Sequence, residues 1–158
     1  MMSLELAKAY LSKYGKDKDI MLLKESSATV ELAAKALGTQ PERIAKSLSF
    51  LGKDNALIVV CAGDCKIDNH AYKERFRCKA KMLKPEEVEK YTNHTIGGVC
   101  PFGVPNETKV YLDESLKRFD FVYPACGTAN SAIKLTNGEL EEILPNSEWV
   151  DVCKGWRE

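Results

Sequence analysis

Lys46 occupies a place in the sequence where a cation could take part in chemistry. It lies in the segment 43–48 (RIAKSL), where a short polar turn gives way to an apolar stretch. The apolar neighbours indicate that the chain enters the core there, so the lysine would stand at the wall of a pocket. A partly desolvated ammonium group is a compact cation that can change its protonation state. Lys46 could therefore hold a carbonyl oxygen or a phosphate, and the alternative is an ordinary surface lysine.

Two glycine-containing loops could bring backbone amides close to a ligand. Residues 95–106 contain three glycines and two prolines, and a second special loop spans residues 124–130 around Gly127. This composition is typical of shaped loops rather than of regular structure. Because Gly97, Gly98 and Gly127 have no side chain, nothing on these residues would block the approach of a ligand to the backbone.

A cysteine nucleophile is an alternative source of chemistry. Cys100 is the best placed of the six cysteines, because glycines precede it and Pro101-Phe102-Gly103 follow it. The two histidines, His70 and His94, lie in no recognisable nucleophile motif, and the Gly-x-Ser-x-Gly motif is absent. A thiol hydrolase that uses Cys100 therefore stays open.

Metal and nucleotide cofactors find little support in the sequence. Cys61 and Cys65 together with His70 offer three ligands, but their spacing matches no common zinc motif. The glycine-rich motifs that bind nucleoside triphosphates and dinucleotides are absent. We expect neither a metal nor a cofactor.

The charge distribution is uneven although the net charge is zero, with 23 basic and 23 acidic residues. Residues 66–84 contain seven basic and two acidic residues, a net charge of +5, whereas the C-terminal segment is acidic. Zero net charge excludes a generic polycation that coats nucleic acid, but a local patch can still bind an anionic partner. The alternative for this segment is a solvated helix face followed by a charged strand.

Length and composition indicate an ordinary globular protein. The 158 residues are enough for one domain, 1–158, and 44% of them are apolar. The longest apolar run, residues 56–62, is far shorter than the ~20 residues that cross a bilayer as a helix. The N-terminus lacks the features of a secretory signal, and the cysteine spacing suits a reduced setting. We expect a cytoplasmic protein that does not bind membranes.

Capping residues and hydrophobic periodicity predict a mixed α/β domain. Helices are predicted over residues 4–14, 30–37 and 68–76. Three more are predicted: a short helix that begins at the Thr39-x-x-Glu42 box, one that opens at 84–87, and one that Thr136 caps. The predicted strands span residues 47–51, 57–62, 109–112, 119–123 and 131–135. The strand at 57–62 is apolar on both faces and should be central.

Three motifs in order resemble the YbaK/EbsC family, the free-standing relatives of the editing domain inserted into bacterial prolyl-tRNA synthetases. They are residues 33–48, the loop 97–103 (GGVCPFG) and the loop 125–131 (ACGTANS), and the resemblance extends from about residue 29 to 144. It implies a six- or seven-stranded mixed, barrel-like sheet surrounded by helices. It also implies hydrolysis, without a metal, of the ester that links a wrong amino acid to tRNA.

The resemblance assigns roles to particular residues. It makes Lys46 the side chain tied to activity. It places nine residues in the amino-acid pocket: Gly97, Gly98, Cys100, Pro101, Phe102, Gly103, Gly127, Asn130 and Ser131. Many relatives have serine where Cys100 stands, and the residues around Cys126 vary, so the choice of amino acid stays open.

Ester hydrolysis passes through an oxyanion, which the amides of Gly97, Gly98 and Gly127 could stabilise together with Lys46. No strong general base is visible, so water or a group on the substrate would be the nucleophile. The expected substrate is proline tRNA charged with cysteine or alanine, because one methylene gives a prolyl site only ~1–3 kcal/mol of discrimination. A binding module without turnover, acting as a regulator, is the alternative.

The expected partner is the acceptor end of a mischarged tRNA, with a prolyl-tRNA synthetase as a candidate carrier and no role for DNA. Phosphate contacts come from lysine and arginine. The basic segment would supply them through Lys73, Arg75, Arg77, Lys79 and Lys81.

Overall fold

The apolar run predicted to be central forms the middle strand of a five-stranded mixed sheet in the computed structural model, which describes residues 2–24 and 29–157. In order across the sheet, the strands are β6 (Tyr123–Pro124), β2 (Ile44–Leu51), β3 (Ala56–Ala62), β5 (Lys109–Asp113) and β8 (Glu148–Val150). β2 and β3 are antiparallel, and the other neighbouring pairs are parallel. Every residue of β3 is buried, which confirms the prediction from its two apolar faces.

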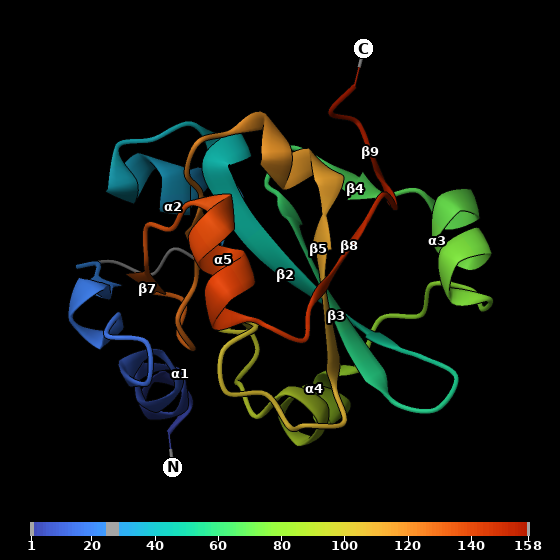
Figure 1. Ribbon diagram of the computed structural model, residues 1–158, viewed down its shortest axis with the longest axis horizontal. Helices are drawn as coiled ribbons and strands as arrows, with labels where there is room; N and C mark the ends of the chain where they lie inside the picture. Colours follow the sequence, from blue (N-terminus) through green and yellow to red (C-terminus); the bar gives the residue numbers. More distant parts are fainter. Residues whose placement is uncertain (1, 25–28, 158) are drawn as a thin grey trace.

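The helices pack around this sheet, and three of them begin at the predicted capping residues Thr29, Asp68 and Thr136 (Figure 1). They are α1 (Ser3–Ser12), α2 (Val30–Leu37), α3 (Asn69–Phe76), α4 (Pro85–Thr92) and α5 (Asn137–Ile143), with 3-10 turns η1 (Asp17–Asp19), η2 (Pro41–Arg43) and η3 (Glu114–Arg118). The Thr29 hydroxyl accepts a hydrogen bond from the N–H of Leu32 at the start of α2, and Gly38 ends it in the left-handed conformation. In the part of the chain that the structure describes, no helix is long and apolar enough to span a membrane.

The sheet differs in detail from the expected six or seven strands. The main sheet has five strands in the described part of the chain, and two further antiparallel pairs lie apart from it. These pairs join β1 (Met21–Leu22) to β7 (Ser131–Ala132), and β4 (Lys66–Ile67) to β9 (Cys153–Lys154). The α/β class and the mixed sheet with surrounding helices are confirmed.

Several strands are shorter than predicted or were not predicted. The segments predicted as strands at 119–123 and 131–135 pair regularly only at β6 and β7, with one isolated bridge between Val122 and Leu135. β1, β4, β8 and β9 are two or three residues long, too short for a periodic pattern to show. The short helix predicted from the Thr39 box is the three-residue 3-10 helix η2, which starts at Pro41 without a side-chain cap.

Candidate functional site

A cavity of about 370 Å³ lies beside the outer edge of β2. Its walls come from α2, from the chain around the start of α4, and from the two glycine-containing loops. Most of the lining is apolar, including Val30, Leu37, Ile44 and Val99. A mostly apolar cavity with few polar groups is the usual form of a small-molecule site.

Lys46 is the only charged side chain among the described residues that line this cavity. It sits on β2 opposite Cys61 of β3, and its ammonium group reaches the turn that follows β3. There its Nζ donates hydrogen bonds to the main-chain oxygens of Cys65 and, at 3.4 Å, of Gly63. A lysine ammonium has three N–H donors, so one donor is left for a ligand.

The outer edge of β2 is open beside Lys46. β6 pairs with the first two residues of β2, and the segment 81–83 bonds to Ser49 and Leu51 near its end. Neither partner reaches Ser47, which lines the cavity. Because alternate residues of a strand direct their backbone groups to the same edge, the N–H and C=O of Ser47 point outward, as the paired groups of Ser49 and Leu51 do. The cavity therefore has a backbone donor and acceptor in its wall.

The glycines of the two loops mostly serve packing between loops. A side chain on Gly98 would place its Cβ 2.2 Å from the Gly127 oxygen, and one on Gly127 would place it 2.4 Å from the Ser3 oxygen. The N–H of Gly98 also donates to the Thr95 oxygen at 2.9 Å. Gly97 differs, since it lines the cavity, has a φ of 87°, and a Cβ added to it would meet only the Cβ of Ala129, at 3.7 Å. Of these three glycines, Gly97 is the one that lines the cavity.

Comparison with known proteins identifies the family of this chain. The sequence model of one family, the aminoacyl-tRNA editing domain, matches residues 24–143. The chain belongs to the aminoacyl-tRNA editing domain family. It is 50% identical over 156 residues to the uncharacterized protein YwhH of Bacillus subtilis (strain 168), covering 98% of this chain and 99% of that one.

Other members of the editing family carry more specific names. A protein of Enterococcus faecalis (strain ATCC 700802 / V583) named "Putative Cys-tRNA(Pro)/Cys-tRNA(Cys) deacylase EbsC" is 27% identical over 75% of this chain and 79% of its own length. The solved structure described as "a putative trans-editing enzyme for prolyl tRNA synthetase" superposes with a TM-score of 0.87 at 28% identity, covering 97% of this chain and 98% of that one.

The structure separates the nine residues that the family resemblance assigned to the pocket. Gly97 and Ser131 line the cavity. The other seven lie outside its lining: Gly98, Cys100, Pro101, Phe102, Gly103, Gly127 and Asn130. The Ser131 hydroxyl accepts from the N–H groups of Cys126 and Thr128, so it also holds the second loop in shape.

Cys100 is built into the core rather than presented to a ligand. Its side chain is fully buried, with Sγ 3.4 Å from Nε2 of His94, which is equally buried. Burial raises the pKa of the Cys100 thiol to about 12, and burial also lowers the pKa of His94. Both groups are therefore neutral near pH 7, and the pair lacks the thiolate that a cysteine nucleophile requires.

The predicted tRNA-binding residues are spread over more than one place. Figure 1 shows α3, which carries Lys73 and Arg75, on the opposite side of the view from α2 and β7, whose residues line the cavity. Arg75 forms an ion pair with Glu148. Lys81 lies close to the cavity, unlike the residues on α3. It directly precedes Met82, which lines the cavity, and its main-chain oxygen accepts the N–H of Leu51 at the edge of β2.

Sequence reasoning missed the open backbone at Ser47 and the apolar mouth of the cavity. Met82 and Ile96 line the cavity and yet are 56% and 66% exposed, so they stand at its entrance. The only signal in the sequence was their large apolar side chains in otherwise polar or glycine-rich segments. An unpaired strand edge leaves no mark on composition or periodicity.

Proposed function

We propose that this protein is an aminoacyl-tRNA deacylase, which hydrolyses the ester bond of a mischarged tRNA. The observation that supports this most is Lys46, the one cation among the described residues of the cavity wall, which is mostly apolar and lies next to an open strand edge. Membership of the editing family supports the same class of substrate. The cavity mouth, with exposed Met82 and Ile96, offers apolar surface to the terminal base of the acceptor end.

The reaction needs donors for the charge that develops on the ester carbonyl oxygen. The free N–H of Lys46 and the outward N–H of Ser47 are two donors in this wall, and Gly97 supplies backbone nearby. A water molecule, or a group of the substrate itself, attacks the carbonyl carbon. The bond between that carbon and the ribose oxygen then breaks, and the ribose oxygen takes up a proton. Donors fixed in advance around an oxyanion are commonly the largest contribution to such a rate.

For the substrate we propose proline tRNA charged with cysteine or alanine. The mostly apolar wall suits small, uncharged amino acids, since the described lining offers no acidic partner for a cationic side chain. The name of EbsC, which refers to cysteine on proline tRNA, supports this class. A separate hydrolytic pocket is useful for such errors, because the aminoacylation site of a synthetase excludes a smaller amino acid poorly.

The test is release of the amino acid from a panel of charged tRNAs, with Cys- and Ala-tRNA(Pro) as substrates and Pro-tRNA(Pro) as the correctly charged control. Lys46→Ala should lower the rate by on the order of 100-fold, the usual effect of removing one oxyanion donor. Lys134→Ala is the matched control, because Lys134 is exposed and outside the cavity lining. Circular dichroism establishes that both variants fold.

Two outcomes would contradict the proposal. A folded Lys46→Ala variant with near-normal turnover would remove Lys46 from the reaction. Binding of charged tRNA without release of any amino acid would instead favour the binding module, for which the absence of an acidic or histidine base in the described lining is the supporting observation. Cys100→Ser should keep most of the activity, and its complete loss would revive the thiol mechanism.

A further inference from the structure

Two neighbouring cysteines and a third from the C-terminal part of the chain meet beside the end of β3, the central strand. Cys61 lies near the end of β3, Cys65 in the turn that follows, and Cys153 at the start of β9. Their sulfur atoms all lie within 4.8 Å of one another. This is the one group of three potential ligands of this kind in the described part of the chain. The sequence suggested Cys61, Cys65 and His70, but His70 is exposed and pairs with Glu74.

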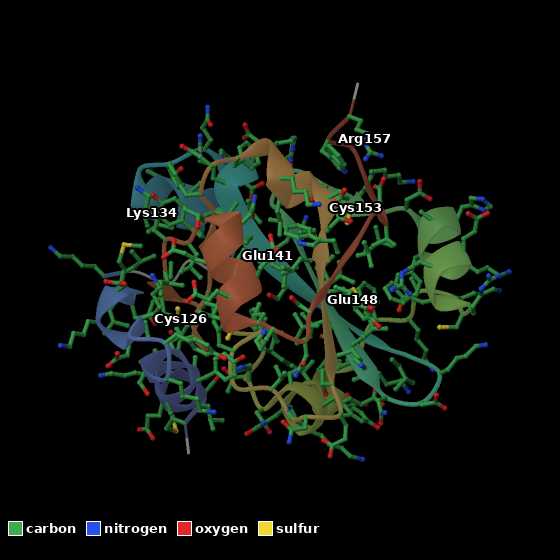
Figure 2. All side chains as sticks on the ribbon, in the orientation of Figure 1. Cys126, Lys134, Glu141, Glu148, Cys153 and Arg157 are labelled. Carbon is green, nitrogen blue, oxygen red and sulfur yellow. The ribbon has the colours of Figure 1, made fainter. Side chains whose placement is uncertain are left out.

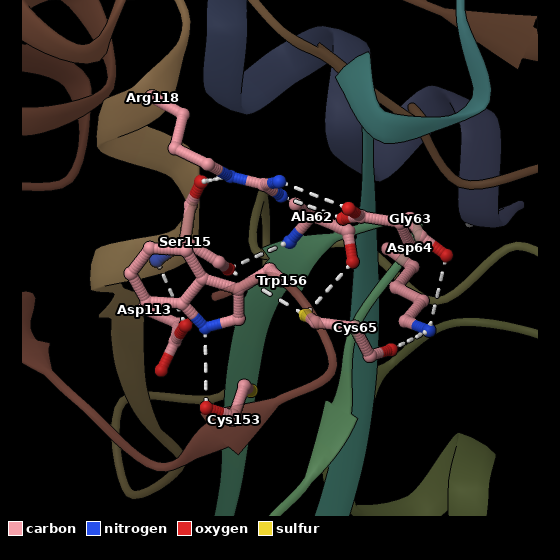
Figure 3. Close-up of polar contacts among 10 residues, drawn as sticks. Ala62, Gly63, Asp64, Cys65, Asp113, Ser115, Arg118, Cys153 and Trp156 are labelled. Carbon is pink, nitrogen blue, oxygen red and sulfur yellow. Dashed lines mark hydrogen bonds and ion pairs between the residues drawn. The ribbon is translucent and has the colours of Figure 1, made fainter. Parts of the chain in front are cut away.

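The three thiols are enclosed by the protein, and neighbouring side chains contact two of these cysteines. All three are buried, and none forms a disulfide. Figure 3 shows Cys65 directed toward Ser115, whose Oγ is 3.5 Å from its sulfur. The Trp156 indole N–H donates to the main-chain oxygen of Cys153 at 3.1 Å (Figure 3). The cluster is therefore a preformed group of buried side chains beside the end of the central strand.

The proximity of the three sulfur atoms makes them suitable as a set of ligands, because one cation between them could contact all three. The thiolate is the form of cysteine that binds metals, so a bound cation would take the place of the thiol protons.

We propose that Cys61, Cys65 and Cys153 form a binding site for a thiophilic divalent cation such as Zn²⁺. Three sulfur ligands select soft or borderline cations over Mg²⁺ and Ca²⁺. Zn–S bonds of about 2.3 Å in tetrahedral geometry place sulfur atoms roughly 3.8 Å apart, which the observed cluster reaches with small side-chain rotations. The cation replaces the S–H protons, which pass to the solvent, and a water molecule completes the coordination.

The site is separate from the proposed deacylase cavity. None of the three cysteines lines that cavity, although Lys46 donates to the main-chain oxygen of Cys65. A bound cation would stabilise the turn that holds Lys46 and would join β9 to the central strand. Metal binding is measured without tRNA, so the result does not depend on the proposed reaction.

The experiment is a titration of the reduced, metal-free protein with Cd²⁺, followed by competition with Zn²⁺. Cadmium bound to thiolates absorbs in the ultraviolet in proportion to the number of Cd–S bonds. We expect one ion per chain, and Zn²⁺ should displace it. Cys153→Ser should reduce the absorption per bound ion to about two thirds and weaken binding by more than the ~10–100-fold that loss of an outer contact costs.

Cys78→Ser and Cys126→Ser are the matched controls. Cys78 is partly exposed and outside the cluster, and Figure 2 shows Cys126 far from Cys153, beside α1. Both variants should bind Cd²⁺ as the unaltered protein does. If Cys153→Ser does not fold, a rise in the unfolding temperature of the unaltered protein with Zn²⁺, reversed by a chelator, still supports the site. No Cd²⁺ binding, or equal loss in Cys78→Ser, would overturn the proposal.

Discussion

Replacing Gly63 with alanine tests how the turn after β3 positions Lys46. The Cβ of an alanine at this position would lie 2.2 Å from the Pro41 oxygen and 2.7 Å from Cγ1 of Val30. The Pro41 oxygen already accepts the N–H of Ile44, so it cannot move away without losing that hydrogen bond. The same glycine supplies one of the two carbonyl oxygens that hold the Lys46 ammonium group.

The size of the effect follows from these contacts. The Pro41 oxygen is more than about 1 Å inside ordinary van der Waals distance of the added carbon. Overpacking costs roughly 1–3 kcal/mol, and a backbone oxygen, which cannot rotate away as a side chain does, puts this site at the upper end, about 3 kcal/mol. For a chain of this length the unfolding temperature should fall by roughly 6–12 °C. Displacement of the carbonyl should also lower deacylation at permissive temperature.

Thermal unfolding followed by circular dichroism measures the change in stability. The matched control is Gly138→Ala in α5, where the new carbon would meet only Oγ1 of Thr136 at 3.9 Å. That variant should be more stable by about 0.5 kcal/mol, because alanine loses less backbone entropy than glycine on folding. A Gly63→Ala variant as stable as the unaltered protein would refute the packing described around this turn.

Two further predictions concern pH and the tRNA. Burial lowers the pKa of His94 in the folded protein. Below about pH 6.5, His94 therefore binds a proton in the unfolded chain before it does so in the folded one. The free energy of unfolding should fall as the pH drops below about 6.5, because the proton stabilises the unfolded state. Denaturant unfolding from pH 7.5 to 5 should show this loss, and the loss should persist in a His70→Gln control; a loss that disappears in the control would contradict it. Lys81→Glu at the cavity mouth should reduce deacylation and its salt dependence more than Arg75→Glu on α3 does. A larger effect of Arg75→Glu would instead indicate that the tRNA docks on α3.

The local elements could be predicted from the sequence because their signals are local. Thr29 and Gly38 mark the ends of α2, and Asp68 caps α3 by accepting the N–H groups of His70 and Ala71. The run 56–62 is apolar on both faces, and this alone predicts a strand buried in the middle of a sheet. Lys46 is also recognisable from local sequence, because a charged residue at the border of an apolar strand is unusual.

The site itself was decided by contacts between distant segments. Nothing near Ser47 in the sequence predicts that its strand edge is open, because that depends on where β6 and the segment 81–83 stop pairing. The exclusion of Cys100 from the cavity depends on the packing of its loop around His94.

The thiol cluster likewise depends partly on the local sequence and partly on the tertiary structure. The spacing of Cys61 and Cys65 was visible in the sequence, but Cys153 joins them only because β9 pairs with β4. Residue types and their periodicity therefore determined which elements form and which side chains are chemically capable. Tertiary structure decided which of them share a cavity, because pairing and packing between remote segments depend on the shape of the whole chain.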